Sequence, residues 1–514
     1  MFNYLISLMI ILPVVGAVLQ GFLPDVSTRG ENHLSRPAGR WVALATSLLS
    51  SLCGILTVVS MQAATADPQA TESFAWIGSY AIHYDMAVDG LNAPLVLLIS
   101  ILFPILISAE WNRRTGVRGM HGLFLVLQTA FIGAVCAQDL FLQLFFWALT
   151  AFPFYFLIGI WGTRDRESAA FRSIVTACVG NAFLLAALIL IYYSIDPHTF
   201  SLHDLAGGKL NGKMFEFLGY EASVPVVAFV LISIGLAFRA PIWPLHGWFM
   251  HAAEEAPLSV VVALGAASVP VAVYIFERLT CTLFPETLLH FAPAIVIVGT
   301  VNLLVGALCA VTQRNLRKLL AFICVSQVGI LLLGVGSLSS PGFVGAVYQK
   351  LALGLAIAGF GLFANLLGER SGTTDFRTES GGRVFDGIAL QAPTVAVVAG
   401  VVVASLLAFP GSGGFVGSSL IIIGAFSSYP VAALLAGISG LLAAYCLFTM
   451  YRYVFLGSLA DSEQNGAATF TDLTIREKLY LLPLVASLLF FGIYPKPLIE
   501  LVRPTVVTLL SMVK

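Results

Sequence analysis

Hydrophobic residues occur in continuous blocks of about 20 positions along almost the whole chain, separated by short polar stretches. A helix of that length spans the hydrocarbon layer of a membrane, whereas membrane β-barrel strands alternate apolar and polar positions. The pattern therefore predicts an all-α polytopic membrane protein with about 14 transmembrane helices. Their predicted starts lie near residues 3, 41, 91, 119, 139, 167, 224, 257, 290, 318, 341, 391, 430 and 479.

Two of these blocks contain Pro and Gly, at Ala237–Trp248 in the seventh predicted helix and at Leu406–Gly417 in the twelfth. A broken helix at membrane depth persists only where it lines a cavity or is buried in protein. Because the breaks in helices 7 and 12 are five helices apart, they predict two inverted five-helix repeats. Two ordinary proline kinks remain the alternative. The predicted parts are residues 1–118 (helices 1–3), 119–280 (first repeat), 290–455 (second repeat) and 456–514 (loop, helix 14 and tail).

Composition narrows the function. Of 514 residues, 58% are hydrophobic and 10% charged, which excludes a soluble globular domain and makes the lipid bilayer a partner. With 26 basic and 27 acidic residues and no basic stripe, we expect no nucleic-acid partner. The seven cysteines are scattered singly and no Rossmann unit is present, so we expect no cofactor in this chain. The run Phe2–Pro24 is interpreted as a retained first helix and not as a signal peptide.

Basic residues favour one orientation. Alternate predicted loops contain three basic residues each: Arg29, Arg36, Arg40; Arg113, Arg114, Arg118; Arg164, Arg166, Arg172; Arg314, Arg317, Lys318; Arg370, Arg377, Arg383; and Arg452, Arg476, Lys478. The opposite loops and the tail contain only Lys209, Lys213, Arg278, Lys496, Arg503 and Lys514. By the positive-inside rule, both termini are predicted to lie on the outer side of the membrane.

Ionisable residues at membrane depth are costly and are candidates for an ion path. The candidates here are Arg239, His246, His251, Glu254, Glu255, Lys350 and Asp139, together with the polar Gln327. Glu277 and Arg278 are expected at the membrane interface. Each candidate also has a structural alternative. Asp139 could cap a helix, and Lys350 could snorkel to the surface. The group from Arg239 to Glu255 could form an ion-paired hinge. A zinc site is not expected, since His251 follows His246 without an HExxH motif.

Several ordered motifs resemble the antiporter-like subunits of respiratory complex I, in particular the chain M or mitochondrial subunit 4 family. They are Asp89–Asn92, Phe146–Trp147, Phe154–Ile158, Trp161–Gly162, Pro244–Trp248, Glu255–Pro257, Val325–Gly329, Glu369–Arg370, Gly381–Gly382 and Phe409–Gly417. The resemblance implies a membrane subunit without redox centres in an NADH:quinone oxidoreductase-type translocase of the respiratory chain. It also implies a bacterial inner membrane and other membrane subunits as partners, including further antiporter-like ones.

The sequence departs from this family at the positions that the family uses for protons. The resemblance places a glutamate at Ala148, lysines at Arg239 and near Val269–Pro270, a histidine at Gln327 and a glutamate at Ser418. Arginine keeps its proton and cannot shuttle it, and alanine, proline and serine do not titrate at physiological pH. We therefore expect a degenerate or rerouted proton path, with Arg239 paired to Glu254 or Glu255 because a lone buried charge is expensive.

Three functions remain open. The first is an antiporter-like subunit of a complex I-type assembly with that degenerate path. The second is a stand-alone or small-complex cation/proton antiporter or inorganic-carbon uptake subunit. The third is an active proton pump that uses Lys350, His251, Glu254 and Glu255 instead. Redox subunits among the co-purifying partners would favour the first or third, and a lone partner the second.

Overall fold

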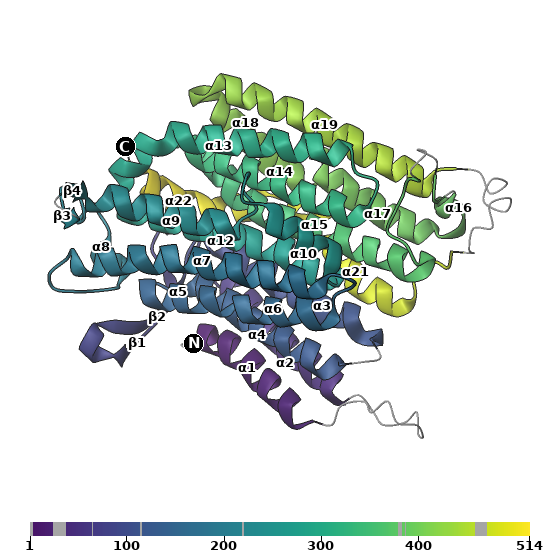
Figure 1. Cartoon of the computed structure of the whole chain (residues 1–514), viewed down its shortest axis with the longest axis horizontal. Helices are drawn as coiled ribbons and strands as arrows, with labels where there is room; N and C mark the ends of the chain where they lie inside the picture. Colours follow the sequence, from purple (N-terminus) through teal and green to yellow (C-terminus); the bar gives the residue numbers. More distant parts are fainter. Residues whose placement is uncertain are drawn as a thin grey trace. The chain divides into compact units, whose positions relative to one another are not determined.

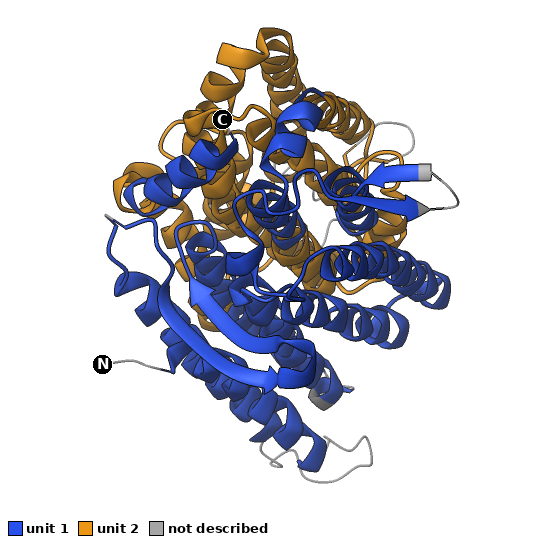
Figure 2. Cartoon of the chain, turned by 90° about the vertical axis from the view of Figure 1, so that its left-hand side faces the viewer, with its two compact units in different colours: residues 1–240, 270–293, 499–514 blue, residues 241–269, 294–498 orange. Residues whose placement is uncertain are grey.

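The structure, a computed structural model, describes residues 4–23, 38–63, 65–113, 116–217, 220–378, 383–385, 387–457 and 470–513. Figure 1 shows long helices joined by short loops and hairpins. The chain divides into two compact units, coloured separately in Figure 2: residues 1–240, 270–293 and 499–514, and residues 241–269 and 294–498. The motif Gly381–Gly382, the basic residues Arg29, Arg36 and Arg114, and Lys514 lie outside the described residues.

The first unit contains most of the N-terminal half. Its helices are α1 (Leu5–Phe22), α2 (Ala38–Val59), α3 (Ala93–Ala109), α4 (Val117–Cys136), α5 (Leu140–Leu149), α6 (Ala151–Trp161), α7 (Arg166–Tyr193), α8 (Leu202–Leu205) and α9 (Val224–Arg239). It also takes in nearly all of α12 (Val269–Leu283) and most of α22 (Lys496–Val513).

Two antiparallel hairpins interrupt the helical pattern in the same unit. One pairs β1 (Gln69–Ile77) with β2 (Ile82–Val88), and the other pairs β3 (Met214–Phe217) with β4 (Tyr220–Ser223). Short 3-10 turns occupy Gly78–Tyr80 and Glu110–Asn112. The sequence analysis predicted helices only, because these strands fall in the loops between apolar blocks.

The second unit contains the centre and most of the C-terminal half. Its helices are α10 (Gly247–Glu255), α11 (Leu258–Val262), most of α13 (Pro285–Val311), α14 (Leu316–Gly336), α15 (Ser340–Ser371), α16 (Ile388–Gln391), α17 (Pro393–Leu406), α18 (Gly413–Ser428), α19 (Pro430–Phe455) and α21 (Ile475–Ile493). Polar caps start several of them. Ser339 accepts from the Gly342 N–H at α15, and Thr474 and Glu477 form a capping box at α21.

Helix length and hydropathy confirm an integral membrane protein. Among the described residues, ten helices are long and apolar enough to cross a membrane, and α21 with α22 forms a further pair bent by 69°. Four apolar helices, α3, α9, α17 and α18, are shorter. Helices α17 and α18 flank the break in the twelfth predicted helix, and α9 precedes the break in the seventh. The count of 14 spans stays a prediction. The residues after helix 14, predicted as a tail, form the helix α22 instead, because apolar positions recur at helical spacing there.

Both predicted helix breaks are confirmed. Helix α9 ends at Arg239 and α10 begins at Gly247, while α17 ends at Leu406 and α18 begins at Gly413. In the second break, Ala408 and Gly411 have positive φ angles of 52° and 93°. The left-handed backbone at these positions prevents the helix from continuing. Both breaks thus interrupt the regular helical hydrogen-bond pattern in the middle of apolar sequence.

A third irregularity was not predicted. Residues Ala263–Ser268 form a π-helical turn that is buried throughout, directly before Val269 and Pro270. A proline inside a helix cannot donate to the carbonyl four residues earlier, and its ring collides with that carbonyl. Widening the preceding turn accommodates Pro270. The eighth span is therefore distorted at the position where the resemblance places a lysine.

Candidate functional site

Arg239 lies at the last turn of α9 and is 4% exposed. Its guanidinium carbon lies 4.4 Å from the centroid of the Trp147 ring, and it donates a hydrogen bond to the Thr150 hydroxyl. That hydroxyl in turn donates to the Trp147 carbonyl at 2.7 Å. Trp147 and Thr150 are both fully buried. Among the described residues, the positive charge is thus stabilised by an aromatic face and a hydroxyl, and not by a carboxylate.

Glycines bring the helices that carry this site close together. A Cβ added at Gly180 of α7 would lie 2.6 Å from the Gly235 carbonyl oxygen of α9, and 3.3 Å from Cγ of Arg239. No other residue type fits at such a distance without moving the backbone. The close approach of α7 and α9 therefore sets the position of Arg239 beside α5.

The predicted ion pair of Arg239 with Glu254 is wrong. Glu254 instead pairs with Lys318 at 2.9 Å, and both side chains are more than a third exposed. Next to it, Arg317 donates to the backbone carbonyls of Ala256 at 2.5 Å and Glu254 at 3.4 Å. Arg317 thus satisfies carbonyls at the C-terminal end of α10, and Lys318 neutralises the Glu254 carboxylate. Sequence reasoning did not foresee these contacts, because α14 follows about 60 residues later.

The two histidines of this segment lie at α10. His246 is its N-cap residue, with its ring 6.4 Å from that of Phe322, and His251 Nδ1 lies 3.0 Å from the Gly247 carbonyl. The break before α10 is fixed by Asn302, whose side chain accepts from the Trp243 N–H and donates to the Val325 carbonyl, both at 2.7 Å. Asn302 is fully buried and was missed, because a lone asparagine inside an apolar block carries no sequence signal of its own.

Three further candidates lie in the second unit. Lys350 of α15 is fully buried, and Ser418 of α18 is 9% exposed. Gln327 of α14 has a buried amide oxygen with no hydrogen-bond partner among the described residues. The neighbour of Lys350, Gln349, packs its amide against Gly417, since a Cβ there would lie 2.2 Å from Gln349 Oε1.

Asp139 has a structural role in the first unit. It is the N-cap of α5, accepting from the N–H groups of Leu142 at 3.0 Å and His83 at 3.2 Å. Burial raises the pKa of this carboxyl above its usual range, and the backbone hydrogen bonds oppose that rise only in part. The helix-cap alternative named above therefore describes its contacts.

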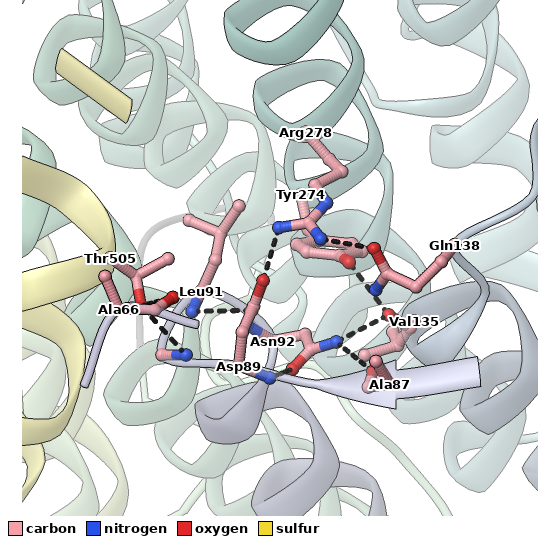
Figure 3. A network of polar contacts seen from close by, with 11 residues as sticks. Ala66, Ala87, Asp89, Leu91, Asn92, Val135, Gln138, Tyr274, Arg278 and Thr505 are labelled. Atoms are coloured by element: carbon pink, nitrogen blue, oxygen red, sulfur yellow. Dashed lines mark hydrogen bonds and ion pairs between the residues drawn. The ribbon is translucent and has the colours of Figure 1, made fainter. Parts of the chain in front are cut away.

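A second polar cluster, drawn in Figure 3, was not among the predicted sites. The carboxylate of Asp89 forms an ion pair with Arg278, which also donates to Gln138 Oε1 at 2.5 Å. The other Asp89 oxygen accepts from the N–H groups of Leu91 and Asn92 at 3.0 and 3.1 Å. Asn92 bonds the carbonyls of Ala87 and Val135, and Tyr274 also donates to Val135.

This cluster shows that Glu277 and Arg278 are enclosed by protein, while their position at the membrane interface stays a prediction. Arg278 is 7% exposed and Glu277 is fully buried. The signal that existed was the motif Asp89–Asn92, which the resemblance included without assigning it a role. Among the described residues no group of three or more His, Cys, Asp or Glu side chains could hold a metal ion.

Comparisons with known proteins agree with this fold. Residues 137–444 match the family model described as NADH:quinone oxidoreductase/Mrp antiporter, TM. Subunit M of NADH-quinone oxidoreductase from Rhodobacter capsulatus is 28% identical over 99% of this chain and 96% of that protein. A chain 4 of NAD(P)H-quinone oxidoreductase from Thermosynechococcus vestitus is 32% identical over 96% of this chain and 89% of that protein.

The fold also matches a solved structure. A chain of respiratory complex I from Thermus thermophilus superposes with a TM-score of 0.85 at 24% identity, covering 99% of this chain and all of the other. The segment that matches the family model, residues 137–444, contains Asp139, the Arg239 site, α10, Gln327, Lys350 and both helix breaks. The chain therefore belongs to the NADH:quinone oxidoreductase/Mrp antiporter family of antiporter-like integral membrane proteins.

Proposed function

We propose that this chain is an antiporter-like membrane-arm subunit of a complex I-type proton-translocating oxidoreductase, with a degenerate or rerouted proton path. Relatives named as subunit M or chain 4 of such enzymes match it over nearly the full length of both chains. The proposed partners are the other membrane subunits of that assembly, including further antiporter-like ones. The chain itself is proposed to carry no redox cofactor.

The Arg239 site carries the proposal of a degenerate path. A proton relay needs groups that gain and lose a proton near neutral pH, such as paired lysine and glutamate. Here a permanently charged arginine lies against Trp147 and Thr150, and the residue that follows Trp147 on α5 is Ala148. Each contact of Arg239 is one that stabilises a fixed charge, and none of these partners accepts its proton.

The test is the substitution Arg239→Lys in the assembled complex, reconstituted into liposomes. Lysine keeps the positive charge but can titrate when buried. If the subunit is a scaffold, protons moved per electron should remain within experimental error of the unsubstituted complex. A matched control is Arg172→Lys on the exposed face of α7. A large loss of proton translocation in the first variant alone, with assembly intact on a native gel, would contradict the proposal.

A stand-alone or small-complex cation/proton antiporter or inorganic-carbon uptake subunit is the second candidate. This candidate is supported by the description of the matching family, which names Mrp antiporters beside NADH:quinone oxidoreductase. Affinity purification of the tagged chain from its own membrane discriminates the two. Redox subunits in the purified complex support the first function, and their absence together with a single membrane partner supports the second.

The membrane and orientation are also proposals. We propose a bacterial inner membrane with both termini outside, supported by the uneven distribution of basic residues in the sequence. Single cysteines introduced at Lys209 and Arg314 test this with a membrane-impermeant thiol reagent. In spheroplasts, of the two introduced cysteines only the one at position 209 should react.

A further inference from the structure

Three arginines surround one tyrosine ring at the end of α19. The guanidinium carbons of Arg377, Arg383 and Arg452 lie 4.4, 5.7 and 5.7 Å from the centroid of the Tyr453 ring. Arg452 is in the last turn of α19, and the other two come from the segment between α15 and α16. Residues 69 and 75 positions apart in sequence thus place three positive charges around a single aromatic side chain.

The backbone holds these arginines in place. Arg377 and Arg383 face each other in an isolated antiparallel bridge, and Arg383 donates to the Leu456 carbonyl just beyond α19 at 3.0 Å. In the part of the chain that the structure describes, Nε of Arg377 is buried without a hydrogen-bond partner. The fold therefore positions Arg377 and Arg383, and the exposed Arg452 completes the cluster from the end of α19.

Three like charges this close together repel each other. Cation–π contact offsets only part of that repulsion at a half-exposed tyrosine. A phosphate group has the opposite charge and several oxygens that match the guanidinium fork, so arginine clusters bind it well. The charge pattern therefore favours an anionic ligand with a phosphate group.

The adjoining face of α19 has the chemistry of a lipid contact. Exposed apolar residues recur every three or four positions toward the cluster, at Val431, Leu434, Ile438, Leu441, Tyr445 and Phe448, and the next position in this series is Arg452. From Leu441 to Arg452 the helix rises about 16 Å, roughly half the hydrocarbon thickness of a bilayer. An acyl chain anchored by its headgroup at the arginines has this length.

We propose that Arg377, Arg383 and Arg452 bind the phosphate of one anionic phospholipid, whose acyl chain lies along Leu441, Tyr445 and Phe448 of α19. Basic side chains at the end of a membrane-spanning helix lie at headgroup level, where anionic lipids concentrate. The row of exposed apolar residues on α19 explains why the ligand is a lipid and not free phosphate. The arginines explain why it is anionic and not phosphatidylcholine.

The test uses the purified, assembled complex in mild detergent, titrated with phosphatidylglycerol and with phosphatidylcholine of the same acyl chains. Native mass spectrometry measures the lipid retained by the tagged chain. Arg452→Gln should weaken phosphatidylglycerol binding about fivefold, and the triple glutamine variant at least about tenfold, with phosphatidylcholine unchanged. Arg452→Lys should retain most of the binding. The matched control, Arg164→Gln, removes an exposed arginine outside the cluster and should have no effect.

Several outcomes overturn the proposal. One is equal retention of phosphatidylglycerol by the triple variant and the unsubstituted protein. Another is displacement by inorganic phosphate at the lipid's own concentration, which would assign the site to free phosphate. A third is loss of a partner subunit with lipid retention unchanged, which would assign the arginines to a protein contact. If the triple variant does not fold, the single variant Arg452→Gln decides, because this exposed arginine contacts Tyr453 through its charge alone.

Discussion

At the residue scale, Asp89 and Arg278 form an ion pair that is almost fully shielded from solvent. Removing one partner leaves the other charge buried, which typically costs about 3–5 kcal/mol. We predict that Arg278→Met and Asp89→Asn each lower the apparent unfolding temperature strongly, and that the double variant loses less than the sum of the two. The measurement is thermal unfolding of the purified complex, with loss of this subunit as the signal. It gives the coupling energy between Asp89 and Arg278.

A matched control is the pair Lys318 and Glu254, both of whose side chains are more than a third exposed. Exposed pairs contribute about 0–1 kcal/mol, so Lys318→Met should change the unfolding temperature little. Equal losses from the buried and the exposed pair would contradict the structural role given to Asp89 and Arg278.

Two carboxylates outside the membrane spans should give pH effects of opposite sign. Burial tends to raise the pKa of Asp472, but hydrogen bonds from the Thr394 hydroxyl at 2.6 Å and from three backbone N–H groups lower it below its usual range. A carboxyl with a lowered folded-state pKa stabilises the fold above its unfolded pKa of about 3.9, and loses that contribution as pH falls. Asp472→Asn should therefore reduce stability at pH 7 and flatten its decline below about pH 5.

Asp139 is the reverse case. Burial raises its pKa in the folded state, so the folded chain binds more protons than the unfolded chain, and stability decreases as pH rises from about 4. Asp139→Asn keeps an N-cap acceptor at α5 without the charge. Its unfolding temperature, relative to the unsubstituted protein, should increase between about pH 4 and 7. A difference that stays constant across this range would rule out the titration of Asp139.

Sequence reasoning succeeded at this scale for intrinsic chemistry and failed for partners. The permanence of the Arg239 charge and the absence of a carboxylate at position 148 follow from residue type alone. The contacts of Arg239 with Trp147 and Thr150 do not, because they join residues about 90 positions apart. The ion pair of Arg278 was missed for the same reason, because its partner Asp89 lies 189 positions away.

At the element scale, the close crossing of α7 and α9 depends on two glycines. Gly180→Ala would place a Cβ 2.6 Å from the Gly235 carbonyl, so the helices would have to separate and Arg239 would shift from Trp147. We expect a loss of about 1–3 kcal/mol in stability, as for other overpacked sites. The control Gly437→Ala on α19 meets nothing within 4 Å and should be neutral or slightly stabilising. Thermal unfolding of both variants in parallel checks the difference.

The helix breaks were predictable and the π-helical turn was not. Pro and Gly within an apolar block signal a break in any sequence, and both breaks lie where they were predicted. Pro270 alone does not reveal whether a helix kinks, ends or widens, since packing around it decides. The hairpin strands were missed because they fall in the loops between apolar blocks, and the strand Met214–Phe217 has only four residues.

The inverted repeat stays a prediction at this scale. We expect residues 119–280 to superpose on residues 290–455 helix for helix in opposite membrane orientation, with the breaks after Arg239 and Leu406 equivalent. An experimental structure of the assembled complex in a lipid bilayer provides the test. Breaks at different membrane depths, or helices that match without inversion, would leave two independent proline-induced kinks as the better interpretation.

At the scale of the whole molecule, the open question is whether any proton path runs through this subunit. Lys350 is the one lysine placed by sequence inside an apolar block, and the structure buries it fully in α15. Lysine is a residue type that can take part in proton transfer, whereas Arg239 keeps its proton. If the path is rerouted and not lost, Lys350 is therefore the residue on which it depends, together with His251, Glu254 and Glu255.

Replacing Lys350 by Met removes the titrating group while keeping a flexible side chain of similar length. For a scaffold subunit, we expect the reconstituted complex to move the same number of protons per electron as the unsubstituted one, provided that native gels show full assembly. The control Lys318→Met removes an exposed lysine of the same unit. A large drop in protons per electron for Lys350→Met alone would establish a rerouted path, because a scaffold role gives a buried lysine no means of affecting coupling without affecting assembly.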